Sequence, residues 1–197
     1  MKILALELSS PVGSVAFRDG EETRDFRTFP ADRKDSGFFY ENLQAIYGAN
    51  PKPDLIVVGL GPGSYAGVRI AIATALGLRE VSGSRLQGLP SICAMDRAEY
   101  VFIGDARRNS FVIAHVRNGQ CAEGPILASE EELRGRLSRV EKLPVIATEP
   151  LPQFGEVIVE HPSALRLAEL VPEYGCGEFE TLEPIYLRPP HITTPRV

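Results

Sequence analysis

The chain has 197 residues, of which 44% are hydrophobic and 24% are charged, and its formal net charge is −5. These values are typical of a soluble globular protein with one ordinary domain or two small ones, and they exclude a strongly basic protein of the kind that binds nucleic acid alone. No apolar run is long enough to span a membrane, and the distant cysteines Cys93, Cys121 and Cys176 predict a reducing cytoplasm without a disulfide or zinc framework.

In the first half of the chain, apolar runs and turn residues predict strands and helices in a regular order. The start, MKILALELSS, has a short apolar run that reaches Glu7 early, so we interpret it as a first strand rather than a signal peptide. Asp19-Gly20 is a two-residue hairpin signal between the second and third strands. The predicted strands are 2–8, 14–18, 21–29 and 54–60, and the predicted helices are 36–47 and a second one that ends near Glu80.

The second half repeats this order with little residue identity. Asn118-Gly119 is the equivalent hairpin signal, and Ser129 with Glu132 has the spacing of a capping box. Two such copies predict an α/β protein of two lobes, residues 1–97 and 98–197, each with a mixed sheet and helices against it, and a tail that can pack back. A single α/β domain with coincidental turns is the alternative. The predicted strands here are 100–105, 110–116, 120–127 and 143–148, and the predicted helices are 129–140 and 161–171.

A glycine-rich turn leads into the second helix and raises the possibility of a phosphate site. The stretch GPGSYA, residues 61–66, matches the permissive dinucleotide pattern G-x-G-x-x-G/A. However, no acidic residue lies near Leu86, where a ribose contact is expected, and no lysine between Lys52 and Lys142 allows a P-loop. The pattern G-x-S-x-G of a nucleophile elbow is also absent around Ser64.

Small residues recur along the same helix in two rows. Residues four apart share one face of a helix, and glycine inside a helix costs about 1 kcal/mol relative to alanine, so close packing must offset that cost. The partner of this packing is either the protein's own sheet or another polypeptide, and both can hold on different faces. One row is Gly63, Gly67, Ala71 and Ala75, and the neighbouring row is Ala66, Ile70, Ala73 and Gly77.

Taken together, several motifs resemble the bacterial TsaB (YeaZ) family from Ile3 to Arg188. They are ILALELSS with SVAF, then GLGPGSYAGVRIAIATALGL, IGDARRNSFVIA, HPSALRLAEL and EPIYLR. The resemblance implies the actin/Hsp70/sugar-kinase (ASKHA) fold, with two ribonuclease-H-like lobes that are each a mixed five-stranded sheet with helices.

The resemblance also implies a function: a non-catalytic scaffold subunit for threonylcarbamoyl-adenosine modification of tRNA. The family pairs with the catalytic paralogue TsaD, which binds nucleotide and metal, and the ATPase TsaE joins them. The chain is then cytoplasmic, binds no cofactor tightly by itself, forms a homodimer when alone and meets tRNA only through the complex. The implied interface residues are Gly61, Pro62, Gly63, Ser64, Tyr65, Gly67, Val68, Arg69, Ala71 and Ala75.

Other candidate residues lie at turns and on one helix. The resemblance implies a degenerate nucleotide-facing turn at Glu7, Ser9 and Ser10, with Glu where the family usually has Asp, and it leaves Asp35 where the family more often has His. Asp105 and Arg107 lie at the end of a predicted strand and are expected at the cleft between the lobes. The group of Arg134, Arg136 and Arg139 shares a helix with acidic residues and is predicted to be a solvated face.

No catalytic residue is predicted. His115, His161 and His191 are too far apart in sequence for a two-histidine helical metal site. The alternative functions are an ATP-dependent phosphotransferase or hydrolase of the same fold, a stand-alone homodimeric binding module, and a glycoprotease-like peptidase, for which the sequence selects no Ser-His-Asp set.

Overall fold

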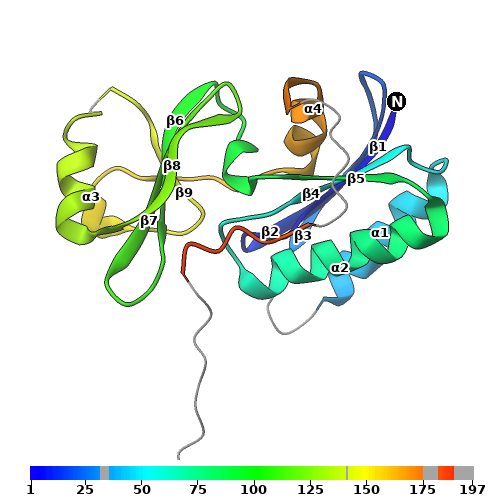
Figure 1. Ribbon diagram of the computed structural model, residues 1–197, viewed down its shortest axis with the longest axis horizontal. Helices are drawn as coiled ribbons and strands as arrows, with labels where there is room; N and C mark the ends of the chain where they lie inside the picture. The colour runs from blue at the N-terminus through cyan, green and yellow to red at the C-terminus, as the bar shows by residue number, and fades with distance from the viewer. Residues whose placement is uncertain (32–35, 141, 175–181, 189–197) are drawn as a thin grey trace, which may run out of the picture.

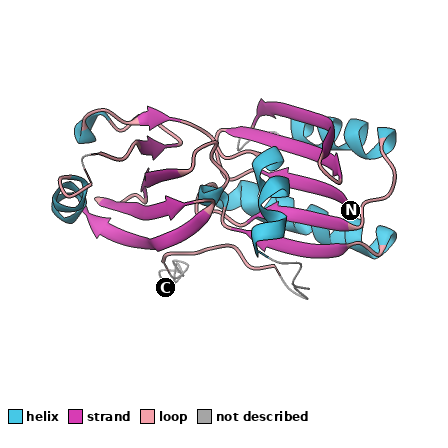
Figure 2. Ribbon diagram, turned by 90° about the horizontal axis from the view of Figure 1, so that it is seen from above, coloured by secondary structure: helices cyan, strands magenta, loops and turns pink. Residues whose placement is uncertain are grey.

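The computed structural model describes residues 1–31, 36–140, 142–174 and 182–188, and its strands form two five-stranded sheets. The strand orders are β3-β2-β1-β4-β5 and β10-β9-β6-β7-β8. Figures 1 and 2 show the two sheets side by side along the long axis of the molecule. The predicted fold class, two mixed five-stranded sheets with helices, is confirmed.

The first sheet combines an antiparallel meander with parallel strands. Strands β1 (Lys2–Glu7), β2 (Val12–Asp19) and β3 (Glu22–Pro30) are antiparallel, and β4 (Leu55–Gly59) and β5 (Arg85–Leu89) continue from β1 in parallel. The helices of this half are α1 (Gly37–Ala49) and α2 (Tyr65–Ser82). Sequence reasoning did not predict β5, because RLQGL mixes polar residues with glycine and gains strand structure only from its pairing with β4.

The second sheet repeats this plan. Strands β6 (Glu99–Asp105), β7 (Ser110–Arg117) and β8 (Gln120–Ser129) are antiparallel, β9 (Val145–Ala147) joins β6 in parallel, and β10 (Ile158–Val159) follows. Helix α3 (Glu130–Leu137) begins with the predicted capping box, in which Ser129 and Glu132 bond each other's backbone. The remaining helices are α4 (Ala164–Tyr174) and two short 3₁₀ turns, Ser91–Cys93 and Pro152–Phe154.

The alternating side chains of the first sheet bury two separate faces. Residues such as Leu4, Leu6 and Ile56 pack under α1 and α2. The opposite face, with Ile3 and Ala5, belongs to a core that also holds α4 and one face of the second sheet. The outer face of the second sheet packs against α3.

Helix α4 comes from the second half of the sequence but packs on the first sheet. It contacts β1, β2 and β4, and the amide of Ala164 at its start donates to Ser14 Oγ of β2 at 2.9 Å. Figure 1 shows α4 between the two sheets. Residues 98–197 therefore do not keep all their elements on their own sheet, and one apolar core joins the two halves.

The segment 182–188 returns to the first half, alongside the start of α2. The Ile185 amide donates to the carbonyl oxygen of Leu60 at 2.9 Å, and Leu182 is buried in the core under α1 and α2. The ring of Tyr186 stacks on that of Tyr65 with a centroid separation of 5.4 Å. The segment thus fastens the loop that precedes α2.

The structure also bears on the cysteines and on the absence of a membrane span that the sequence predicted. The Sγ atoms of Cys93 and Cys121, which are distant in sequence, lie 3.4 Å apart and are not joined by a disulfide. No helix in the described part of the chain is both long and apolar enough to cross a membrane. Asp35, Cys176 and His191 lie outside the described residues.

Candidate functional site

The glycine-rich loop between β4 and α2 has the predicted strand–turn–helix form, and its backbone is fastened to neighbouring segments. The Gly61 amide donates to Ser91 Oγ at 2.9 Å, and the Ser64 amide donates to the Ser9 carbonyl at 2.7 Å. Ser64 is the N-cap of α2, because its Oγ accepts from the Gly67 amide at 3.3 Å. Two amides that a phosphate cradle needs are therefore already bonded within the protein.

Part of the row of small residues predicted as an interface faces the protein's own core, which corrects that prediction for Ala71 and Ala75. Ala71 and Ala75 are fully buried and Val68 is 3% exposed, all in the core under α2. A Cβ atom added to Gly67 would overlap the carbonyl oxygen of Leu8, and one added to Gly63 would overlap that of Ser9. Gly63 and Gly67 are small because α2 begins directly against the backbone of Leu8 and Ser9, and Ala71 and Ala75 are too buried to form a surface for a partner.

The neighbouring row points away from the sheet. We call it the outer row of α2, and it comprises Ala66, Ile70, Ala73, Gly77 and Val81. All of these are exposed except the half-buried Ile70, and Val81 is 80% exposed. A Cβ atom on Gly77 would meet nothing within 4 Å. The outer row is therefore a strip of small and apolar side chains that the described part of the chain leaves uncovered.

An aromatic and cationic cluster marks the start of this strip. Tyr65 and Arg69 are both exposed, and Arg69 lies over the Tyr65 ring at 5.0 Å from its centroid while donating a hydrogen bond to the Tyr65 hydroxyl. The Tyr186 ring stacks on the Tyr65 ring. Of the other predicted interface residues, Gly61 is buried, Pro62 and Ser64 are half-buried, and Gly63 is exposed.

The predicted nucleotide-facing turn brings Glu7, Ser9 and Ser10 together, but the carboxyl group points inward. Glu7 is fully buried, and its Oε1 accepts from the Ser9 amide at 2.6 Å. A Cβ atom on Gly59 of β4 would overlap Oε2, which has no hydrogen-bond partner among the described residues. Burial raises the pKa of Glu7, while the hydrogen bond from the Ser9 amide opposes this shift.

Asp105 and Arg107 bond each other at the turn between β6 and β7. The Arg107 amide donates to Asp105 Oδ1 at 2.6 Å, and its Nη1 lies 2.8 Å from Oδ2. Arg107, Arg108 and Asn109 all have positive φ values, between 54° and 63°, a backbone region that non-glycine residues seldom adopt. The pair is largely solvent-exposed and so contributes little stability, and its predicted place at the cleft stays a prediction.

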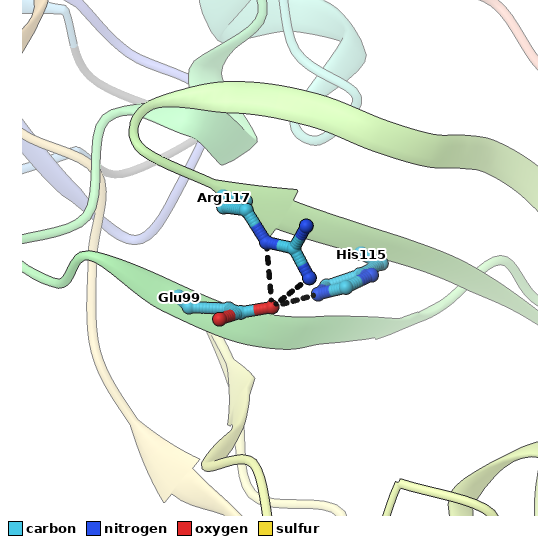
Figure 3. A network of polar contacts seen from close by, with 3 residues as sticks. All are labelled: Glu99, His115 and Arg117. Atoms are coloured by element: carbon cyan, nitrogen blue, oxygen red, sulfur yellow. Dashed lines mark hydrogen bonds and ion pairs between the residues drawn. The ribbon is translucent and has the colours of Figure 1, made fainter.

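Sequence reasoning missed a network on the second sheet (Figure 3). Glu99 Oε1 accepts hydrogen bonds from His115 Nε2 at 2.8 Å, from Arg117 Nε at 2.9 Å and from Arg117 Nη2 at 2.7 Å. These bonds lower the pKa of Glu99, chiefly the bond from Arg117. The three residues come from adjacent strands and share one face. The period-2 alternation of β6 and β7 was the available signal, but only strand register places the residues side by side.

The predicted solvated face of α3 is exposed at Arg134, Arg136 and Arg139, but these residues differ in what they contact. Arg134 pairs with Glu130 at 2.7 Å on the helix surface, as expected for residues four apart. Arg136 and Arg139, in contrast, line a cavity beside β7 and β8 together with His115. Among the described residues, no group of three or more His, Cys, Asp or Glu is arranged to hold a metal ion.

Two proteins from Pseudomonas aeruginosa have the same fold. A crystal structure described as an uncharacterized protein with similarity to peptidase YEAZ matches with a TM-score of 0.73 and 20% identity, covering 95% of this chain and 99% of that chain. The structure described as YeaZ matches with a TM-score of 0.66 and 20% identity, covering 94% and 99%. The resemblance seen in the sequence is thereby confirmed at the level of the fold.

The sequence comparison adds a relative of unassigned function. The chain is 29% identical over 143 residues to the uncharacterized protein ML0378 of Mycobacterium leprae (strain TN), which covers 70% of this chain. The aligned part is 38% of that relative, so the chain spans less than two fifths of its length. No protein-family model matches the chain.

Proposed function

We propose that this chain is a member of the TsaB (YeaZ) family and a non-catalytic scaffold subunit for threonylcarbamoyl-adenosine modification of tRNA. Its work is to dock on the catalytic paralogue TsaD and hold the complex, including the ATPase TsaE, in a competent arrangement. The observation that carries this proposal is the outer row of α2. The YeaZ fold, which extends over nearly the whole chain, supports it.

The outer row suits a helix from another subunit. Ala66, Ala73 and Gly77 are small and exposed. A second helix can therefore pack close to α2, with a distance between the helix axes near the lower limit of the usual range of about 8–10 Å. Burial of exposed apolar side chains such as Val81 would add a hydrophobic contribution. The exposed Tyr65 and Arg69 lie at one end of the strip, and such residues are enriched at the centres of protein interfaces.

The position of Glu7 supports a scaffold rather than an enzyme. Magnesium and phosphate chemistry needs a carboxylate that a hydrated cation can reach, but this carboxyl group is fully buried against Gly59 and the Ser9 amide. The phosphotransferase and hydrolase alternatives depend on such a group. We therefore assign ATP and metal to the partner subunits.

The remaining parts of the proposal follow from the same assignment. The isolated chain pairs with itself through the outer row, and TsaD displaces the second copy. Contact with tRNA is made only by the complex, which fits the net charge of −5. The site of action is the cytoplasm.

Reconstitution of tRNA modification tests this function directly. TsaD and TsaE of the same organism, with ATP, threonine, bicarbonate and the enzyme that makes the activated threonylcarbamoyl group, are combined with and without this chain. We expect modified adenosine only when the chain is present and co-purification of the chain with TsaD. Equal modification in its absence would contradict the proposal.

A further inference from the structure

A cavity in the second half of the molecule is lined by both apolar and charged residues. It has a volume of about 260 Å³ and lies between β7, β8 and the end of α3. Val101, Ile113 and Ile126 supply apolar surface, whereas His115, Arg136 and Arg139 supply polar groups. This cavity lies in a different sheet from the outer row of α2, and the inference below does not depend on the proposed function.

Two features of the fold produce this cavity: an irregular pairing of β7 with β8 and the early end of α3. The pairing of β7 with β8 is regular as far as Ile113 with Ile126, then shifts register on either side of His115, which pairs with Glu123. Such irregularities are common beside functional sites because they re-aim side chains. On the other side, α3 is only eight residues long and ends at Leu137, so the sheet beyond this point is not covered by the helix.

The charge of Arg136 helps to lower the pKa of Glu132, after the hydrogen bonds from Ser129, but among the described residues neither Arg136 nor Arg139 forms a close salt bridge of the kind that joins Arg134 to Glu130. Nor are they needed to cap the helix. The amide of Ser138 donates to the carbonyls of Arg134 and Arg136, and the Val140 amide donates to Leu137. Arg136 and Arg139 thus bring two positive charges to the cavity, where Glu123 is the one carboxylate among the lining residues.

The Glu99 network supplies a third polar group in a fixed orientation. Because Glu99 Oε1 accepts from His115 Nε2 (Figure 3), the ring is held in place, and Nδ1 of the neutral ring is a hydrogen-bond acceptor, so the carboxylate-binding donors of the cavity are the two arginines. Arg117 bonds the same Glu99 oxygen through Nε and Nη2, so the charge of Glu99 is balanced without Arg136 or Arg139. A carboxylate that holds a histidine ring in place is a common arrangement at binding sites.

We propose that this cavity binds a small organic carboxylate, with the carboxylate on Arg136 and Arg139 and the apolar body against Val101, Ile113 and Ile126. Guanidinium groups bind carboxylates through strong charge-assisted hydrogen bonds. Inorganic phosphate has no apolar part for the floor of the cavity. A nucleotide is too large, because the volume is below the usual ligand-pocket range of about 300–1,000 Å³.

Benzoate is a suitable probe because it joins a carboxylate to a compact apolar ring. It is titrated into the full-length ¹⁵N-labelled protein, and NMR shifts of the Ala114 and Gly124 amides, which lie at the cavity, are followed. Benzyl alcohol is the neutral control, and inorganic phosphate is the anion without an apolar body. We expect saturable shifts with benzoate and binding at least about tenfold weaker for each control compound.

A pair of matched variants assigns the binding to the two arginines. The double variant Arg136→Gln, Arg139→Gln keeps helix propensity, because glutamine and arginine are similar helix formers, and we expect it to bind benzoate at least about tenfold more weakly. Arg134→Gln, on the same helix but outside the cavity lining, should bind as the wild type does. The proposal is overturned if benzoate gives no saturable shift, if benzyl alcohol binds equally well, or if the double variant retains wild-type affinity.

Discussion

A Cβ atom built on Gly67 overlaps the backbone carbonyl oxygen of Leu8, because α2 rests directly on the end of β1 at this point. Ten residues further along the same helix, a Cβ atom on Gly77 meets nothing within 4 Å. The two glycines therefore have different structural roles. Gly67 permits a close approach inside the protein, whereas Gly77 leaves a gap on the surface of the outer row.

The first prediction follows from this contrast. Gly67→Ala should lower the free energy of unfolding by about 1–3 kcal/mol, because the methyl group must displace the backbone of Leu8, which directly follows β1. Gly77→Ala should raise it by up to about 1 kcal/mol through helix propensity alone. Urea unfolding monitored by circular dichroism measures both. Equal effects of the two substitutions would show that α2 does not rest on β1 as described.

The second prediction separates the two rows of α2 by placing arginine on each. Ala73→Arg should leave the stability nearly unchanged, because Ala73 is exposed, and should abolish pairing with TsaD or with a second copy. Ala71→Arg should prevent folding, because Ala71 is fully buried and the charge would have no partner. Size-exclusion chromatography and thermal unfolding give the two readouts.

Ala122→Arg is the control for that experiment. Ala122 is also exposed but lies on β8 in the other sheet, so pairing should persist in this variant. If Ala73→Arg folds and still pairs as the wild type does, the outer row is not the docking surface.

The third prediction concerns the pH dependence that Glu7 confers. Its pKa is raised in the folded state, chiefly by burial, so the folded protein keeps the proton to a higher pH than the unfolded chain. The stability contribution is therefore full below the unfolded pKa of about 4.3 and is lost as pH rises through the folded value, at about 1.4 kcal/mol for each unit between the two.

Glu7→Gln removes this titration and isolates its effect. The amide can still accept from the Ser9 amide, and its NH₂ group occupies the position of Oε2. We expect the variant to be more stable than the wild type at about pH 8, with the difference shrinking toward about pH 4. Melting temperatures across this range provide the measurement, and a difference that grows toward acid would show that the carboxylate is charged in the folded protein.

The fourth prediction tests the contact between Tyr186 and Tyr65. Tyr186→Ala removes a stacked ring at 5.4 Å and should lower the free energy of unfolding by about 0.5–1.5 kcal/mol. Tyr186→Phe keeps the ring and should have a smaller effect. If both variants unfold at the wild-type denaturant concentration, the segment 182–188 does not stabilise the start of α2.

Much of the secondary structure followed from local patterns. The hairpin at Asn118-Gly119 and the capping box of Ser129 and Glu132 depend on residues within a few positions of each other, and both are present as predicted. Strand β5 was missed for the opposite reason. Its residues carry no strong strand signal, and it exists because β4 offers a parallel partner.

The sequence by itself determined the order of all the strands except β5 and β10, the repetition that makes two mixed sheets, and the presence of two rows on α2 that are rich in small residues. Periodicity and turn chemistry act over a few residues, so they can be interpreted without knowing the rest of the chain. Only the tertiary structure decided which row is buried, that the Glu7 carboxyl points inward, and that His115 meets Glu99 beside a cavity. These relations depend on the contact of distant segments, because the end of β1 determines how close α2 can lie and strand register determines which side chains face each other.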